Sequence, residues 1–244
     1  MEREHEPAAA IRVGDDDEAS VLVADDDPAA ARAAAAALEA EGLEVEWQPD
    51  ASGARRVLAV RKFAAVVLAL SLPDDGLELC REIRAHDPVP IVAVARGYSD
   101  DECVRALRDG ADDYLSTPFS DAVLRARVRA LLRRRDLDRA AVPGATKQVG
   151  TLTIDAARHG VVVDGAFVQL TRSEFEVLAF LADPPRVART RAAIMAHLWR
   201  SDHVGDARAC DVHVLNLRRK LERDPRSPQR LITVRSYGYR LEPA

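Results

Sequence analysis

Three consecutive aspartates, Asp25, Asp26 and Asp27, follow the apolar stretch "SVLVA" at residues 20–24. Crowded carboxylates repel one another and raise one another's pKa unless a cation or a basic side chain lies among them. Mg²⁺ is such a cation, because it prefers oxygen ligands. The alternative is that Asp27 caps the helix that begins at Pro28 while the other two aspartates are solvated. The chemistry open to this cluster is therefore cation binding. No set of nucleophile, base and orienting group accompanies it, so we expect no enzyme.

The elements that position these aspartates are strand and helix patterns that alternate five times between residues 20 and 135. Strands alternating with helices of ten or more residues indicate βαβ crossovers and a parallel sheet that is covered on both faces. Ligands of such sheets bind at the carboxyl ends of the strands, which is where the three aspartates lie. The pattern predicts an α/β fold with a five-stranded, doubly wound parallel sheet.

The second half of the chain has a different pattern. Short strands are expected at 149–154, 159–163 and 166–169, three helices begin near Arg172, Arg191 and Asp206, and "LITVRSYGYRL" closes the chain as two strands around a turn. Strands, three helices and a terminal hairpin fit an α+β winged helix-turn-helix domain. The expected organisation is a disordered tail at 1–19, a first domain at 20–135, a linker at 136–148 and the winged-helix domain at 149–244.

The charge of the chain is divided between these two domains. Residues 146–244 carry 16 Lys and Arg against 11 Asp and Glu, a net of +5, whereas residues 1–145 carry 19 against 29, a net of −10. A basic domain joined to an acidic one indicates a polyanionic partner for the C-terminal part alone.

Composition indicates a globular protein without a membrane span. No apolar run approaches the roughly 18 residues that a bilayer requires, and the start "MEREHEPAAA" lacks a signal-peptide layout, so we expect a cytoplasmic protein. The three cysteines, Cys80, Cys103 and Cys210, are widely spaced and odd in number, which supports neither a disulfide framework nor a metal site. They are expected to be small core residues, and we expect neither a cofactor nor a metal.

Helical geometry divides the last predicted helix into two faces. Cys210, Val214, Leu217 and Leu221 share one face and are expected to pack on the core. The opposite face mixes cations, an amide and apolar groups, which suits the major groove of DNA, because Asn pairs with adenine and apolar groups contact the thymine methyl. The DNA-binding residues expected from this helix and the terminal hairpin are Arg208, Val212, Leu215, Asn216, Arg218, Arg219 and Arg235, with Lys220 as a further phosphate contact.

Six motifs give nearly the whole chain a family resemblance. They are "VLVADDDP", "LPDDGLELCREIR", "GADDYLSTPFSDAVLRARVRALLRR", "LTRSEFEVLAFL", "DVHVLNLRRKLE" and "ITVRSYGYRL". Residues 20–135 resemble a response-regulator receiver domain, and residues 148–242 resemble the effector domain of the OmpR/PhoB type. The resemblance implies a Mg²⁺ site built from an acidic pair and a phosphoacceptor aspartate on the third strand, completed by a Ser or Thr and a Lys on the next two strands.

The sequence keeps the acidic pair, at Asp25 and Asp26, and departs from the rest of this pocket. Alignment of "LALSLP" with the family pattern puts Ala69 at the phosphoacceptor position, and a methyl group cannot form an acyl phosphate. The family's Lys falls on Thr117, and its Ser or Thr falls on Ala95 or on Val94. Each loss removes a separate part that phosphoryl transfer needs, so the sequence predicts an atypical regulator that works without aspartyl phosphorylation.

Two substitutes for the missing groups remain open from the sequence. One of Ser71, Asp74 and Asp75, just past Ala69, is an alternative site of phosphorylation or an alternative metal ligand. With Asp74 or Asp75 as the acceptor, the protein takes part in a conventional phosphorelay. Arg96, at the end of the fourth strand, is an alternative to the metal and the Lys if it pairs with Asp25 or Asp26. The other interpretation of Arg96 is a solvated loop residue.

The resemblance also implies a homodimer through the receiver domain, using its fourth helix, fifth strand and fifth helix. Asp113 and Arg127 match one charge pair across the two-fold axis, whereas Cys103 and Val123 fall where a second charge pair is expected. Apolar contact in its place favours a constitutive dimer. The family's switch aromatic on the fifth strand corresponds to Tyr114.

The function that we expect is sequence-specific binding of double-stranded DNA, at repeated half-sites, by a homodimeric transcriptional regulator. The alternative is a ligand-sensing regulator that binds a small molecule through the degenerate receiver pocket.

Overall fold

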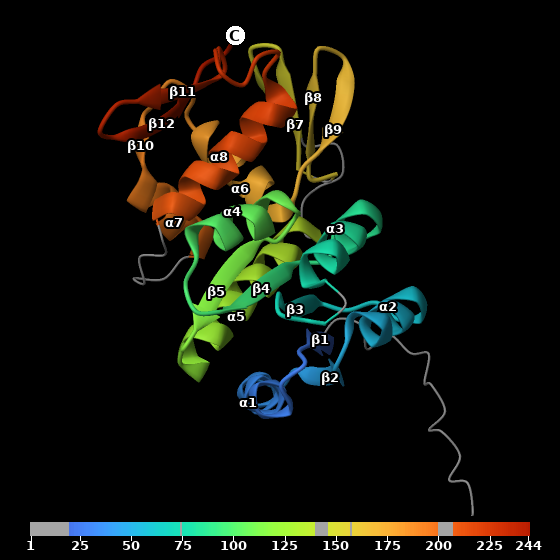
Figure 1. Ribbon diagram of the computed structural model, residues 1–244. Helices are drawn as coiled ribbons and strands as arrows, with labels where there is room; N and C mark the ends of the chain where they lie inside the picture. Colours follow the sequence, from blue (N-terminus) through green and yellow to red (C-terminus); the bar gives the residue numbers. More distant parts are fainter. Residues whose placement is uncertain (1–19, 74, 140–145, 157, 200–206) are drawn as a thin grey trace, which may run out of the picture.

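The protein is described by a computed structural model, which covers residues 20–73, 75–139, 146–156, 158–199 and 207–244. The expected tail at 1–19 lies outside these residues, as do Asp74 and residues 140–145 of the expected linker. In Figure 1 the C-terminal part lies above the N-terminal part, and α8 packs on α4 where the two parts meet.

A five-stranded parallel sheet organises the N-terminal part, in the order β2-β1-β3-β4-β5. The reversal of strand order between β1 and β3 is the switch point of a doubly wound fold, as the sequence predicts. The strands are β1 (Ser20–Ala24), β2 (Glu44–Gln48), β3 (Ala65–Ala69), β4 (Ile91–Arg96) and β5 (Asp113–Thr117). All residues of β1 and β3 are buried, as expected of central parallel strands.

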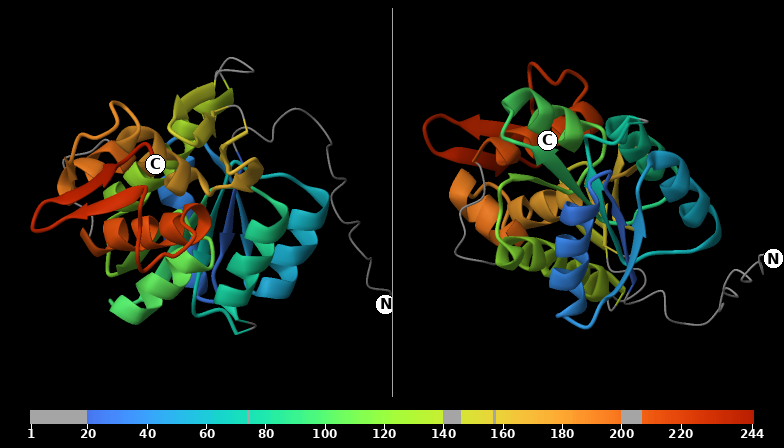
Figure 2. Two further views of the ribbon diagram at one scale, coloured as in Figure 1. Left: turned by 90° about the horizontal axis from the view of Figure 1, so that it is seen from above. Right: turned by 60° about the horizontal axis from the view of Figure 1, so that its bottom comes forward.

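Five helices cover this sheet in two layers, as the two views of Figure 2 show. On one face α1 packs against α5, and on the other α3 packs against both α2 and α4. The helices are α1 (Pro28–Glu39), α2 (Ala51–Val60), α3 (Gly76–His86), α4 (Asp100–Arg108) and α5 (Asp121–Arg139). Asp27 caps α1, since its carboxylate accepts a hydrogen bond from Ala29 N at 2.8 Å, and Pro28 follows at the first helical position.

The C-terminal part combines two antiparallel sheets with three helices. One sheet has the order β6-β7-β8-β9 and the other β10-β12-β11. The strands are β6 (Thr146–Val149), β7 (Leu152–Asp155), β8 (Gly160–Val163), β9 (Ala166–Gln169), β10 (Arg189–Thr190), β11 (Leu231–Val234) and β12 (Gly238–Leu241). The helices are α6 (Arg172–Leu181), α7 (Arg191–Trp199) and α8 (Ala207–Leu221), which begin where the sequence predicts. This arrangement is a winged helix-turn-helix domain.

Three boundaries differ from the sequence prediction. The strand expected at 149–154 is a hairpin of β6 and β7, because Gly150, with φ +60°, turns the chain. Helix α5 continues to Arg139 and β6 begins at Thr146, so both enter the expected linker. The short strand β10 was not predicted, since a two-residue strand carries no alternation.

Two hydrophobic clusters fill the two faces of the parallel sheet. The cluster beneath α1 and α5 belongs to the N-terminal part alone. The cluster beneath α2, α3 and α4 continues without a break into the C-terminal part, where it takes in Phe175, Val212 and Leu217. The two domains therefore share one apolar core along this side.

The first residue of α3 lies against the end of β3. A Cβ atom on Gly76 would lie 2.5 Å from the backbone oxygen of Ala69 and 2.9 Å from Leu70 Cα. Only glycine permits this approach, because backbone atoms cannot move aside as a side chain can. Helix α3 therefore closes directly over the strand end where the resemblance implies a phosphoacceptor.

Gly76→Ala is expected to destabilise the protein by about 1–3 kcal/mol, because the new methyl group overlaps fixed backbone. Gly53→Ala is the matched control, since its Cβ would meet only side-chain atoms of Gln48 and Asp50. Urea denaturation followed by circular dichroism measures both. An equal effect of the two substitutions would contradict the close contact between α3 and β3.

Candidate functional site

The acidic residues that the sequence singled out do lie together at the carboxyl edge of the sheet. The main chain of Asp25 is held by β2, whose Trp47 donates a hydrogen bond from Nε1 to Asp25 O at 2.9 Å. The carboxylate of Asp25 accepts a hydrogen bond from Asp27 N at 2.9 Å. Burial raises the pKa of Asp25 above its ordinary value of 3.8, with smaller upward contributions from Asp26 and Asp27.

Arg96 contacts the second aspartate, as one of the two interpretations of this residue predicts. Its Nη2 lies 3.1 Å from both carboxylate oxygens of Asp26. Arg96 is the last residue of β4, so the strand delivers it to the acidic edge from two strands away. Its charge also opposes the rise in the pKa of Asp25. Arg96 therefore supplies the positive charge that the crowded carboxylates require, although a pair this exposed contributes at most about 1 kcal/mol.

The residues at this edge do not fit the Mg²⁺ site that the resemblance implies. Ala69, 4% exposed, offers no oxygen ligand from its side chain. Asp26 is already engaged by Arg96 and by Ser71, whose Oγ donates to Asp26 Oδ1 at 3.1 Å. Mg²⁺ demands near-octahedral oxygen coordination, which this donor set does not provide. In the described part of the chain no group of three or more His, Cys, Asp or Glu has a metal-binding arrangement.

The remaining pocket positions carry no group that could assist phosphoryl transfer. Ala95 is buried, and it lies beside Ser116 in the β4–β5 register. Thr117 accepts a hydrogen bond from Gly97 N at 3.4 Å and has no positive charge. Asp75 caps α3, since its carboxylate accepts a hydrogen bond from Glu78 N at 3.0 Å. The carboxylate of Asp75 therefore has a structural role.

The surface expected to form the dimer lies against the C-terminal domain. Helix α4 packs on α8, and α5 packs on α7. Asp113 and Arg127 pair with each other at 3.2 Å within the chain, where a pair across a two-fold axis was expected. Cys103 is buried and Val123 is half-buried against the cluster beneath α1 and α5, so neither is the exposed contact that a dimer interface needs. In this conformation the four residues have intrachain surroundings.

The switch aromatic, Tyr114, packs against the cluster beneath α2, α3 and α4. Burial is the main cause of the raised pKa of its phenol, and the nearby Glu102 adds to it. Cys80 and Cys210 are buried as expected, and burial raises the pKa of each thiol to about 12. Thiols this resistant to ionisation are packing groups and not nucleophiles.

Helix α8 has the predicted core face, with Cys210, Val214 and Leu217 fully buried. The opposite face is only partly open to a nucleic acid. Val212 and Asn216 are each 6% exposed, and Asn216 Nδ2 donates to Leu107 O at the end of α4, at 3.1 Å. The prediction that both face outward is wrong for this conformation, because α4 covers them.

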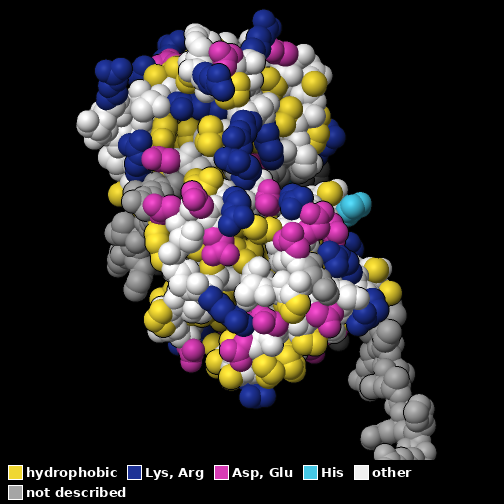
Figure 3. Space-filling model, viewed as in Figure 1, with side chains coloured by type: hydrophobic (Ala, Val, Ile, Leu, Met, Phe, Trp, Pro, Cys, Tyr) yellow, Lys and Arg dark blue, Asp and Glu magenta, His cyan; other side chains and the backbone are white. Residues whose placement is uncertain are grey.

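The other predicted DNA contacts have varied surroundings. Arg218 is tied to the hairpin, since it donates to Leu231 O at 2.6 Å and to Thr233 Oγ1 at 2.7 Å. Leu215 is half-buried, whereas Arg219 and Arg235 are exposed. The side chain of Arg208 lies outside the described residues. Figure 3 shows Lys and Arg side chains gathered over α8, consistent with a polyanionic partner for this helix.

A buried contact that the sequence did not predict joins the two domains. Asp112 is buried between β4 and α6, and its carboxylate accepts hydrogen bonds from Arg84 Nη2 at 2.7 Å, Ile91 N at 3.0 Å and Ser173 N at 3.2 Å. Ser173 Oγ also donates to Asp112 O at 2.9 Å. Ser173 lies in the first turn of α6, where free backbone N–H groups favour an anion. No pattern in the local sequence predicts a pairing between two residues that lie 61 positions apart in the chain.

Comparison with protein families matches both halves of the chain. Residues 21–129 match the family "Response regulator receiver domain", and residues 165–241 match the family "Transcriptional regulatory protein, C terminal". No helix within the described residues has the length and apolarity that would let it span a membrane.

Similar proteins cover most of the chain. The sensory transduction protein RegX3 of Mycolicibacterium smegmatis is 37% identical over 207 residues, which are 84% of this chain and 91% of RegX3. The DNA-binding response regulator MtrA of the same organism is 38% identical over 209 residues, 84% of this chain and 89% of MtrA. A solved structure of a RitR mutant aligns with a TM-score of 0.73 at 21% identity, covering 92% of this chain and 99% of that one, a likeness of fold.

Asp25→Asn is expected to increase the free energy of unfolding at pH 7, by less than about 1 kcal/mol, because the half-exposed carboxylate is partly screened. A raised pKa in the folded state favours the protonated form, so this aspartate contributes stability at low pH that is lost as the pH rises through the folded value. The gain from Asn therefore shrinks as the pH falls toward 3.8.

Urea unfolding at pH 7 and near pH 4 measures this difference. Glu39→Gln, which removes an exposed carboxylate from the same helix-strand unit, is the control and is expected to change little. A loss of stability for Asp25→Asn at pH 7 would show that the ionised carboxylate of Asp25 does not destabilise the folded protein.

Proposed function

Because the chain belongs to the OmpR/PhoB-type family of DNA-binding response regulators, we propose that it regulates transcription without aspartyl phosphorylation. In this proposal the receiver domain serves as a dimerisation module for the winged-helix domain. The observation that carries the proposal is Ala69 at the end of β3, where a phosphoacceptor would stand.

The surroundings of Ala69 support this interpretation. An acyl phosphate requires a carboxylate nucleophile, and the nearby described carboxylates are engaged, Asp26 by Arg96 and Asp75 by the first turn of α3. Phosphoryl transfer further requires a positive charge on the transferred group. The cation present, Arg96, is paired with Asp26, and Thr117 stands where the family has its Lys. Restoring phosphorylation would therefore require more than a new acceptor.

The packing of α8 on α4 supports a second part of the proposal, that DNA binding and dimerisation both need the domains to separate. Asn216 and Val212, which suit base contacts, lie beneath α4. The dimer surface of α4 and α5 lies beneath α8 and α7. One conformational change would free both surfaces together, so the equilibrium between packed and separated domains sets the apparent affinity for DNA.

Treatment of the purified protein with a small-molecule phosphodonor is expected to leave its intact mass unchanged, because Ala69 offers no carboxylate at the acceptor position. Footprinting on genomic fragments without a phosphodonor is expected to show specific protection. A mass increase of one phosphoryl group, localised to Asp74 or Asp75, would favour the phosphorelay alternative. Binding to DNA only after phosphodonor treatment would overturn the proposal.

Ser173→Asp is expected to separate the domains, because it sets a second carboxylate against the buried Asp112. Within α6 itself an Asp in the first turn is favourable, so the winged-helix domain is expected to stay folded. The predicted result is an increase of about tenfold in DNA affinity and a larger radius of gyration in small-angle X-ray scattering. Ser173→Ala, which removes one hydrogen bond without adding charge, is the control. An unchanged radius with unchanged affinity for Ser173→Asp would contradict control by domain packing.

A further inference from the structure

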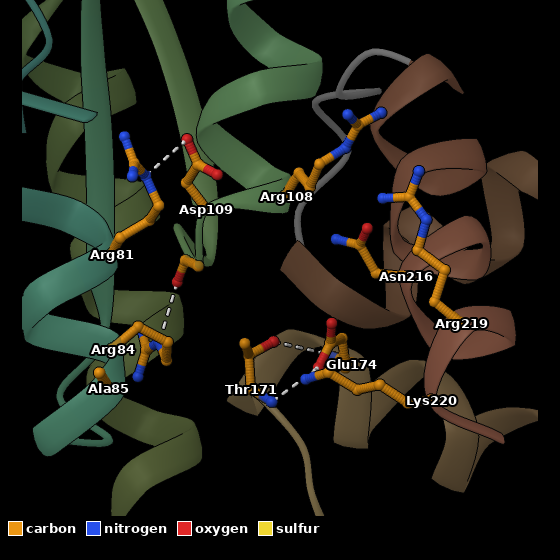
Figure 4. Close-up of a pocket in the computed structure, with 11 residues that line it drawn as sticks. Arg81, Arg84, Ala85, Arg108, Asp109, Thr171, Glu174, Asn216, Arg219 and Lys220 are labelled. Atoms are coloured by element: carbon orange, nitrogen blue, oxygen red, sulfur yellow. Dashed lines mark hydrogen bonds and ion pairs between the residues drawn. The ribbon is translucent and has the colours of Figure 1, made fainter. Parts of the chain in front are cut away.

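A cleft of about 390 Å³ lies at the border of the two domains, between α3 and α4 on one side and α6 and α8 on the other. Five cationic side chains and two carboxylates line it (Figure 4). The volume is within the range of small-molecule binding sites, roughly 300–1,000 Å³. The cleft is separate from the degenerate pocket around Ala69, which lies at the carboxyl edge of the sheet.

Three of the five cations have acidic partners. Arg84 pairs with the buried Asp112 at 2.7 Å, and Lys220 pairs with Glu174 at 2.6 Å. Arg81 lies 3.5 Å from Asp109, and it also pairs with Glu78 at 2.8 Å. The carboxylates of the cleft are therefore already neutralised and do not offer partners to the remaining cations.

Arg108 and Arg219 are the remaining two. Both are exposed, and among the residues that the structure describes neither has a hydrogen bond or an ion pair. Figure 4 shows Arg108 extending from α4 toward α8, and Arg219 standing on α8 on the opposite wall, with its guanidinium group in the region that Arg108 enters. Like charges brought to one interface without a counter-charge disfavour the association of the two surfaces. The positive charges of Arg108 and Arg219 are therefore not neutralised at this interface, and an anion between them would contact both domains.

We propose that the cleft binds a small anion of the phosphoryl class, held between Arg108 of the receiver domain and Arg219 of the winged-helix domain. Guanidinium groups form paired, charge-assisted hydrogen bonds to phosphoryl oxygens, and their planar forks fix the orientation of the anion. Two such forks on opposite walls suit an anion with two or more charges. Asn216, which lies beneath them with its amide nitrogen bound to Leu107 O, forms part of the floor.

Binding of this anion would act on the position of α8. An anion that contacts both domains binds the packed conformation better than the separated one, so it shifts the equilibrium toward packing. Since α8 carries the DNA-contacting face, a step that rests on the proposed function, the anion lowers the affinity for DNA. The binding of the anion itself does not depend on that function.

Isothermal titration of the full-length protein with sodium pyrophosphate, at an ionic strength held constant with sodium chloride, tests the site. Arg108→Gln is expected to weaken pyrophosphate binding about tenfold or more, because it removes one charge-assisted contact. Arg105→Gln is the matched control, since Arg105 is an exposed residue of the same helix that does not line the cleft. It is expected to leave pyrophosphate binding within about twofold. Absence of binding to the wild type, or equal weakening by both substitutions, would overturn the site.

DNA binding measured with and without saturating pyrophosphate tests the consequence. The wild type is expected to lose about fivefold or more in DNA affinity, whereas Arg108→Gln is expected to lose little. If pyrophosphate merely competed with DNA for Arg219, the radius of gyration of the DNA-free wild type in small-angle X-ray scattering would not fall when pyrophosphate is added, and that result would overturn the link through domain packing. Pyrophosphate binding in a protein that fails to protect any DNA would leave the site in place and contradict the proposed function alone.

Discussion

The buried carboxylate of Asp112 holds the two domains in register. It joins Arg84 of the receiver domain to the first turn of α6, and its own side chain is fully buried. A buried charge of this kind is stable only while all its partners are present, because breaking one of them leaves an uncompensated charge. Helix α8 packs on α4 and α7 packs on α5 across the same border between the domains, where the cleft also lies.

Packing of the two domains covers residues of the predicted DNA-contacting face of α8, covers the expected dimer surface and forms the cleft. All three therefore depend on one equilibrium between packed and separated domains. The apolar core that runs from beneath α4 to Val212 favours the packed conformation, whereas the unmatched charges of Arg108 and Arg219 oppose it. The contribution of the apolar core is insensitive to salt, whereas the repulsion between the two arginines is screened by it. A ligand that binds one of the two conformations ten times more tightly shifts this balance up to tenfold, which corresponds to about 1.4 kcal/mol.

The sequence predicted the elements well and their partners poorly. Strand and helix periodicity located the five units of the receiver domain and the starts of α6, α7 and α8. This was possible because buried positions recur at a regular spacing along a strand or a helix, and that spacing is visible in the local sequence. The contact of Arg96 with Asp26 followed from charge at one sheet edge. By contrast, the outward face of α8 was predicted from its own geometry, and Asn216 turned out to be covered by α4. Helical periodicity distinguishes faces but not what lies against them, so contacts such as Asp112 with Ser173 have no local signal.

The contact of Gly76 with the backbone of Ala69 limits what a substitution at the end of β3 could restore. In an Ala69→Asp variant the new carboxylate would lie at an edge whose arginine, Arg96, is paired with Asp26, and beneath helix α3, which Gly76 allows to lie against the strand end. A single substitution at Ala69 therefore leaves the new carboxylate without a free positive charge from Arg96.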